Sequence, residues 1–242
     1  WDSELTESKK AVYLTTYEVL VTLCKLCAPI TPFLTEEIFN PDVRYYLEGY
    51  LNSNTANEFV KHLCVTLHFQ WGDVSKFPLI YSTEKNAEIV GLVKNNNYLA
   101  KLDWDAHETS WDFEENALTF ISKRLDVLKN LGEIVEQYKE EWTERFMQLH
   151  ANEEELNRQF IEIYGLQDEL TPDVPLDEIT ILQQGEIKIE DNQIKWNNDV
   201  LIKQLISYAV GIWMGRYRLD KPGLNIAHPE PTDEELAPYT YQ

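Results

Sequence analysis

Apolar residues recur at steps of three and four over much of the chain, and this spacing predicts amphipathic helices. The first such stretch covers residues 6–27 and ends at Pro29. Pro32 suits the first turn of a second helix, which holds Glu36 and Glu37 early, where the helix dipole favours acids. The N-terminal pattern therefore predicts two helices separated by a proline break.

The next part of the chain changes its period several times. Thr55 and Glu58 have the spacing of a capping box at the start of a helix. Residues 65–71 alternate between apolar and polar side chains and predict a half-buried strand. Residues 84–94 return to helical spacing, and a polar break is predicted at residues 95–97.

A segment rich in tryptophan and acids, residues 102–115, shows no clear period and is interpreted as a loop or docking segment. A long apolar stripe then predicts a helix over residues 125–149. Asn152 is placed to cap a following helix, and Gly165 is placed to end it. The pattern therefore predicts two helices in succession.

Short strands and one last helix are predicted for the C-terminal part. Residues 178–182 and 186–196 have the composition of short strands, with a turn inside the second stretch. The last helix is predicted from about Asp199 to Tyr217. Together these elements predict an α+β fold that is mainly α-helical, with bundle-like helices and a few short strands.

The charge of the chain limits what it can bind. Its 242 residues carry a formal net charge of -21 at pH 7, with a pI near 4.5. Such a chain repels a phosphate backbone, which argues against nucleic-acid binding over the whole surface. A local basic groove remains compatible with this balance.

The cysteines point to the cellular compartment. Cys24 and Cys27 have metal or redox spacing, but they lie inside an apolar helical pattern, which favours core thiols. With Cys64 the cysteine count is odd, which favours a reducing, cytoplasmic location. No apolar run is long enough to span a bilayer, so no membrane partner is predicted. The chain begins at Trp1 and not at Met, which predicts a fragment.

A search for catalytic motifs finds no convincing site. The sequence has no glycine-rich phosphate loop, no Gly-x-Ser-x-Gly elbow and no Asn-Pro-Pro-aromatic motif for holding an extruded adenine. Its histidines are scattered, and His107 is assigned to a solvated loop rather than to a metal site. We therefore predict no catalytic, cofactor-binding or metal-binding residues in this chain.

The stretch from Trp1 to Phe39 resembles a known family. Its Lys-Lys-Ala-x-Tyr start, its Thr-x-Tyr-x-Val-Leu-x-Thr-Leu run and its Ala-Pro-x-x-Pro-Phe-x-Thr-Glu run are similar to the helical anticodon-binding region of bacterial isoleucyl-tRNA synthetases. The resemblance stops near Phe39. It implies that residues 1–43 are a synthetase-like helical piece, with tRNA as an alternative partner.

From about Arg44 onward the chain resembles a second family, the PglX adenine-specific DNA methyltransferases of BREX phage-defence systems. Four stretches carry this: "YLEGYLNSNTANEFVKHLCVTLHFQWGDVSKFPLI", "DWDAHETSWDF", "NEEELNRQFIEIYGLQDELTPDVPLDEITI" and "LISYAVGIWMGRYRLDKPGL". The resemblance implies a target-recognition-like α/β segment over residues 44–115 and a helical C-terminal domain with short strands over residues 116–242. The two resemblances together predict a chimera or a fragment.

In the PglX family an N-terminal catalytic domain binds S-adenosylmethionine and methylates adenine N6 on an extruded base. This chain lacks that domain, so the resemblance implies recognition or scaffold work, no cofactor in this chain and no methyl transfer by the chain alone. The partners it implies are DNA, contacted through the full-length protein, and other BREX components.

A small set of polar and basic side chains could contact nucleic acid. Asn and Gln can pair with an adenine edge at two points, and Lys or Arg can reach phosphate. The candidates are His68, Gln70, Lys76, Asn95, Asn96, Asn97, Arg216, Arg218 and Lys221. The alternatives stay open: a solvated strand face, an Asn-rich turn, and arginines that complement a helix end and pair with acids at 153–155 or 233–235.

Three functions therefore compete. The leading hypothesis is a DNA-recognition and scaffold fragment of a BREX-type adenine-N6 DNA methyltransferase. A tRNA anticodon-binding appendage of an isoleucyl-tRNA synthetase and an acidic protein-interaction module are the alternatives. A titration against duplex DNA and tRNA separates them, because the first two functions differ in the nucleic acid they prefer.

Overall fold

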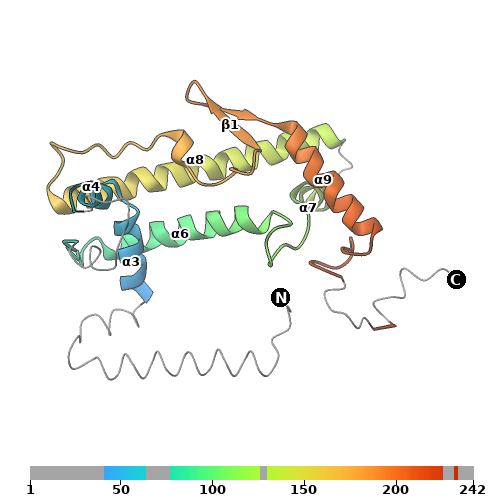
Figure 1. Ribbon diagram of the computed structural model, residues 1–242, viewed down its shortest axis with the longest axis horizontal. Coiled ribbons are helices and arrows are strands. Elements are labelled where there is room, and N and C mark those ends of the chain that lie inside the picture. Colours follow the sequence, from blue (N-terminus) through green and yellow to red (C-terminus); the bar gives the residue numbers. More distant parts are fainter. Residues whose placement is uncertain (1–40, 64–76, 126–129, 226–231, 234–242) are drawn as a thin grey trace. The chain divides into compact units, whose positions relative to one another are not determined.

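The computed structural model describes residues 41–63, 77–125, 130–225 and 232–233 of the chain (Figure 1). The two N-terminal helices expected before residue 40 lie outside the described residues, and so does the strand expected at residues 65–71. The same holds for the three cysteines and for the candidate residues His68, Gln70 and Lys76.

The described part is mainly α-helical with one small sheet, which confirms the predicted α+β class. The helices are α3 (Pro41–Leu51), α4 (Asn54–Leu63), α6 (Asn86–Asp105), α7 (Ala117–Arg124), α8 (Leu131–Tyr164) and α9 (Asn198–Trp213). A short 3-10 turn, η1 (Leu176–Glu178), precedes the strands β1 (Ile187–Glu190) and β2 (Gln193–Trp196).

These elements form two compact units, each assembled from separate parts of the sequence. Among the described residues, unit 1 holds Leu99–Met147 and everything from Leu176 onward. Unit 2 holds the described part up to Tyr98 together with Gln148–Pro175. The division falls inside α6 and α8, so each of these long helices contributes one end to each unit. The predicted division into three consecutive domains stays a prediction.

The core of unit 2 is aromatic. Tyr46, Tyr50 and Phe160 are fully buried, and the Tyr46 and Phe160 rings meet edge to face with centroids 5.4 Å apart. The tyrosine hydroxyls are satisfied, since Tyr46 donates to the Ile80 carbonyl at 2.9 Å and Tyr50 donates to the Pro78 carbonyl at 3.1 Å. The segment after residue 77 is therefore tied to α3 through hydrogen bonds at the edge of a buried cluster.

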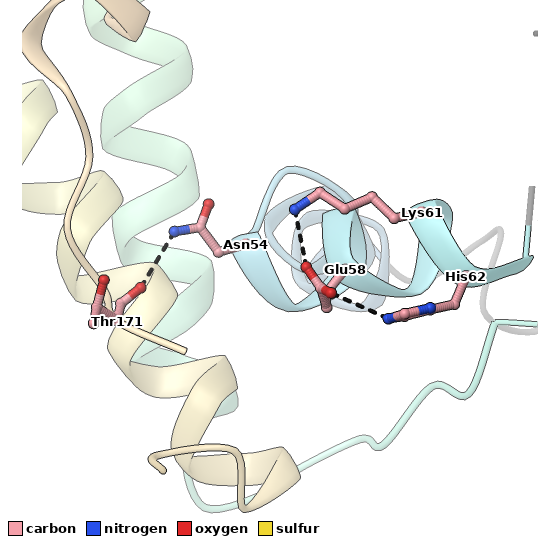
Figure 2. Close-up of polar contacts among 5 residues, drawn as sticks. All are labelled: Asn54, Glu58, Lys61, His62 and Thr171. Atoms are coloured by element: carbon pink, nitrogen blue, oxygen red, sulfur yellow. Dashed lines mark hydrogen bonds and ion pairs between the residues drawn. The ribbon is translucent and has the colours of Figure 1, made fainter. Parts of the chain in front are cut away.

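The start of α4 differs from the predicted capping box. Ser53 caps this helix, because its Oγ accepts from the Ala56 backbone N–H at 3.3 Å. Glu58 instead binds Lys61 at 2.9 Å and His62 at 3.2 Å on the exposed face of the helix (Figure 2). The predicted box at Thr55 is wrong by two residues, since α4 begins at Asn54 and Thr55 already lies inside the helix.

The first turn of α4 is also fixed by the chain after α8. The Asn54 amide donates to the Thr171 carbonyl at 3.3 Å (Figure 2), and the Asn54 backbone N–H donates to the Asn157 side chain at 2.9 Å. Asn157 is buried and also donates to the Pro172 carbonyl at 3.1 Å. Within unit 2, the buried Asn157 amide of α8 therefore joins α4 to Pro172, and the Asn54 side chain adds the bond to Thr171.

The predicted break at residues 95–97 is wrong, because α6 continues through it to Asp105. The side-chain oxygens of Asn95 and Asn96 accept hydrogen bonds from the Asn152 amide of α8, at 2.7 and 2.8 Å. Because these side chains are hydrogen-bonded to the neighbouring helix, they do not compete for the backbone hydrogen bonds of their own helix.

The predicted cap at Asn152 is also wrong, because α8 continues through this residue without interruption. Asn152 is buried, and its oxygen accepts from Gln148 at 2.7 Å one turn earlier. The expected end at Gly165 is confirmed: its φ is 68°, the Leu166 N–H binds the Ile161 carbonyl at 2.9 Å, and the Gly165 N–H binds the Glu162 carbonyl. This is a Schellman motif.

The strands of unit 1 agree only in part with the sequence pattern. The hairpin predicted within residues 186–196 is confirmed, with Glu190 opposite Gln193 and a two-residue loop at Asp191 and Asn192, whose φ angles are 52° and 57°. Such angles suit Asp and Asn in a type I′ turn. The strand predicted at 178–182 is wrong, because η1 occupies its start and Leu182 has a φ of 60°.

Candidate functional site

The basic candidates Arg216, Arg218 and Lys221 lie close together in unit 1, in the segment that follows α9. The helix predicted to reach Tyr217 ends at Trp213. Gly215 has a φ of 79° and ends the helix with a Schellman motif, in which the Arg216 N–H binds the Gly211 carbonyl at 2.8 Å. The predicted end is therefore wrong by one turn, and the arginines lie beyond the helix.

An aromatic anchor fixes the direction of this segment. The Tyr217 ring is buried against Phe113 and Tyr208, with ring centroids 5.4 and 5.1 Å away. A Cβ on Gly211 would lie 2.6 Å from the Tyr217 ring, so only glycine lets the ring pack this closely on α9. Because Tyr217 is buried between them, Arg216 is left exposed and Arg218 half-buried.

Hydrogen bonds to its backbone groups hold the rest of the segment. The buried Asn225 donates its N–H to the Arg216 carbonyl at 2.8 Å, which closes a loop over residues 216–225. The Gly223 N–H binds the Glu114 carbonyl at 2.8 Å, and Lys123 donates to the Leu219 carbonyl at 2.8 Å. The loop is therefore attached to the rest of unit 1 at both ends and near its middle.

The arginine Arg218 has an acidic partner within the loop. Its Nε donates to Asp220 at 2.8 Å, and this bond lowers the pKa of Asp220. The acid that pairs with Arg218 is Asp220, which lies closer in sequence than the expected acids at 153–155 or 233–235. Arg216 and Lys221 are both exposed. They are the loop cations best placed to meet an external anion.

The asparagine candidates lie in the other unit and are partly engaged in packing. Asn95 and Asn96 accept hydrogen bonds from Asn152, as described above, while Asn97 is exposed on α6. A contact of these side chains with a base stays a prediction.

A polar cluster that the sequence analysis missed lies in unit 1. His107 was assigned to a solvated loop, but it is only 6% exposed and its Nε2 lies 2.6 Å from Oε1 of Glu186, which is 0% exposed. Gln204 of α9 donates to the same oxygen at 2.7 Å, and His107 Nδ1 lies 2.6 Å from the Asp103 carbonyl. The assignment was wrong because Trp- and acid-rich composition does not reveal burial.

The pKa shifts of both members of this pair favour their charged forms. Burial would lower the pKa of His107, but the hydrogen bond and charge of Glu186, with help from Asp103, outweigh it and raise the pKa. Burial would raise the pKa of Glu186, but its bonds to His107, to backbone and to Gln204 lower it on balance. The imidazolium donates from both ring nitrogens, to Glu186 and to the Asp103 carbonyl.

The cluster links three separate segments of unit 1. His107 follows α6, Glu186 precedes β1, and Gln204 lies on α9. The Asp103 carboxylate extends the network by accepting from the Leu182 N–H at 3.0 Å, and burial raises the pKa of Asp103. Since the groups are enclosed, we assign them a positioning role: they fix the hairpin and α9, and with α9 the loop that carries Arg216.

The part of the chain that the structure describes holds no group of three or more His, Cys, Asp or Glu residues arranged to bind a metal ion. None of the helices in that part combines the length and the apolar character needed to cross a bilayer.

Comparison with known proteins finds relatives in two groups. The adenine-specific methyltransferase PglX of Lacticaseibacillus casei is 34% identical over 188 residues, which cover 74% of this chain and 14% of that protein. The adenine-specific methyltransferase BrxX of Escherichia coli O9:H4 is 33% identical over 187 residues, covering 76% of this chain and 15% of that protein. The chain thus spans about one seventh of the length of these methyltransferases.

The second group is the tRNA ligases. The isoleucine–tRNA ligase of Clostridium acetobutylicum is 37% identical over 95 residues, which cover 39% of this chain and 8% of that protein. The family described as the anticodon-binding domain of tRNA ligase matches residues 1–143, well past Phe39. Because the methyltransferase match takes three quarters of the chain, the two matches overlap. Through residues 1–143 the chain belongs to the family of the anticodon-binding domain of tRNA ligase, while most of its length is homologous to the adenine-specific methyltransferases PglX and BrxX.

Proposed function

We propose that this chain is a DNA-recognition and scaffold part of a BREX-type adenine-specific DNA methyltransferase, and that methyl transfer is performed elsewhere in that protein. The observation that carries the proposal is the match to PglX and BrxX over three quarters of the chain. The match to the anticodon-binding family covers residues 1–143, which are 59% of the chain, and the tRNA ligase of Clostridium acetobutylicum covers 39%. The family match overlaps the methyltransferase match and does not replace it.

The loop after α9 is the proposed contact with DNA. It brings Arg216 and Lys221 to an exposed, well-braced position on a chain whose net charge is -21. Phosphate contacts need exposed cations on a fixed backbone, and such contacts set the register of a protein on the duplex without reading sequence. The scaffold role rests on the buried pair of His107 and Glu186, which holds the elements that carry the loop.

Base reading is assigned to the amide candidates. Gln70 can make two hydrogen bonds to an adenine edge, as can the asparagines of α6. In the full-length methyltransferase, Gln70→Ala is expected to relax the methylated sequence while leaving DNA affinity within a few fold. An unchanged methylation motif would remove Gln70 from the proposal.

A second function is favoured by the tRNA ligase family match over residues 1–143. The chain would then bind tRNA as an anticodon-binding appendage. Titration of the chain with labelled duplex DNA and with unmodified isoleucine tRNA at equal salt separates the two. Preference for the duplex supports the methyltransferase role, and preference for tRNA supports the appendage. Binding of neither would leave the acidic protein-interaction module.

The remaining parts of the proposal concern location and partners. The odd cysteine count supports a reducing, cytoplasmic location. Other components of a BREX system are the proposed protein partners, and S-adenosylmethionine is the proposed cofactor of the full-length protein rather than of this chain.

A further inference from the structure

A pocket of about 720 Å³ lies within unit 1, between the end of α6, the start of α7, α8 and residues 222–223. All of its lining residues belong to that unit. The volume is in the range that binds a drug-sized ligand or a few side chains of a partner.

The walls of the pocket are aromatic, and two of them are open to solvent. Trp111 is 74% exposed and Phe120 is 52% exposed, while Trp142 forms part of the buried floor. An indole exposed this far, at the edge of a hollow with a buried aromatic base, offers a partner a large apolar surface at little entropic cost.

The charge of the lining selects the sign of the ligand. Five carboxylates line the pocket, from Asp105, Asp112, Glu114, Glu115 and Glu141, against the two cations Lys101 and Arg145. Lys101 is held between two of the acids, 2.8 Å from Asp105 and 2.7 Å from Asp112. Two further cations, Lys123 and Arg124, pair with Glu115 and Glu141, so the pocket and its edge together carry one net negative charge. This balance favours a cationic ligand over phosphate.

The chain's own cations show how such a ligand would bind. The Arg145 guanidinium lies over the Trp142 ring, 4.8 Å from its centroid, and Arg124 lies over Phe120 at 5.8 Å. Arg124 also pairs with Glu141 of the lining. Aromatic faces backed by carboxylates are thus already used for guanidinium stacking around this pocket, whereas the exposed Trp111 ring is the wall left open to a partner.

We propose that this pocket is a docking site for a basic peptide segment of a partner protein, in which apolar side chains fill the aromatic hollow and arginine or lysine heads meet Trp111 and the acidic rim. Charge complementarity and the open aromatic wall carry the proposal. Pro222 and Gly223 of the loop after α9 line the pocket, but the proposal does not depend on DNA binding by that loop, because it concerns the aromatic wall and the acids of the pocket.

The test uses the full chain and a fluorescein-labelled octapeptide of alternating arginine and leucine, with binding followed by anisotropy. Trp111→Ala removes the open wall without changing charge, and we expect it to weaken binding at least about tenfold, as for a truncated aromatic hot spot. Trp213→Ala is the matched control, since Trp213 is 83% exposed on α9 and does not line the pocket. The control is expected to bind as the unaltered chain does.

Charge is tested in the same way. Glu114→Gln in the pocket should weaken binding, whereas Glu190→Gln at the exposed hairpin should not. A peptide with serine in place of leucine should bind at least about tenfold more weakly, because it keeps the charge and loses the apolar anchors.

Several results would overturn the proposal. These are absence of peptide binding, equal losses in Trp111→Ala and Trp213→Ala, or equal losses in the two Glu→Gln variants, which would show unspecific attraction to an acidic chain. A single-stranded oligonucleotide that competes with the peptide and loses affinity in Trp111→Ala would reassign the pocket to nucleic acid.

Discussion

At the scale of single residues, the pair of His107 and Glu186 makes stability depend on pH. The raised pKa of His107 gives stabilisation that is present below about pH 6.5 and lost as pH rises through the folded-state pKa. The lowered pKa of Glu186 gives stabilisation that is present above about pH 4.3 and lost as pH falls through the folded-state pKa. Both contributions are therefore complete between about pH 4.3 and 6.5.

Glu186→Gln leaves a buried imidazolium without its anion, and breaking a buried pair in this way costs about 3–5 kcal/mol. Urea titrations at several pH values measure the free energy of unfolding of both proteins. We expect the variant to be least stable relative to the unaltered chain within that pH window. Outside it the two proteins should converge. A difference that does not change with pH would show that the pair contributes packing rather than charge.

Glycine positions give a second prediction at this scale. Gly211→Ala adds a Cβ that meets the Tyr217 ring at 2.6 Å, so the buried ring must shift. We expect a loss of about 1–3 kcal/mol, as for overpacking elsewhere, measured by urea unfolding. Gly91→Ala is the matched control, because that helical position has nothing within 4 Å of the added Cβ.

The control variant should become more stable by up to about 1 kcal/mol through helix propensity alone. Stabilisation of Gly211→Ala to the same extent would mean that Tyr217 does not pack on α9 as the structure has it.

At the scale of elements, the sequence predicted helix type better than helix ends. The period of α8 is visible from its apolar stripe, but Asn152 looks like a cap unless its partners Asn95 and Asn96 are known, and those lie on another helix. The hairpin loop at Asp191 and Asn192 was predictable, because its two positive φ angles favour Asp and Asn at those two positions. The burial of His107 and Glu186 depends on contacts 79 residues apart, which no local pattern contains.

The Schellman end of α9 supplies the prediction at this scale. Gly215→Ala places a Cβ at a φ of 79°, a left-handed angle that costs about 1–2 kcal/mol for a residue other than glycine. We expect lower stability and faster amide exchange at Arg216, whose N–H binds the end of α9, and at Asn225, whose N–H closes the loop. Exchange rates that stay unchanged at these two amides would show that the loop does not depend on the helix end.

At the scale of the whole molecule, the proposed function requires an acidic chain to contact DNA through a short basic loop. Bulk charge alone argued against nucleic acid, and the candidate residues of that loop were visible in sequence. The exposure of these residues was not visible in sequence. It depends on Tyr217, which is buried between Arg216 and Arg218, and on Gly211, which lies against the Tyr217 ring. Of the sequence candidates, Arg216 and Lys221 combine exposure with a braced backbone.

The most direct measurement is the salt dependence of duplex DNA binding by the chain and by Arg216→Ala/Lys221→Ala. A matched variant, Lys188→Ala/Lys195→Ala, removes two exposed cations from the hairpin and changes the net charge equally. We predict that the loop variant binds more weakly and that its slope of log K against log salt falls in magnitude by about 2, near 0.9 for each lost phosphate contact. The hairpin variant should keep the original slope. Equal losses in both variants, or tighter binding of tRNA that neither variant alters, would contradict the account.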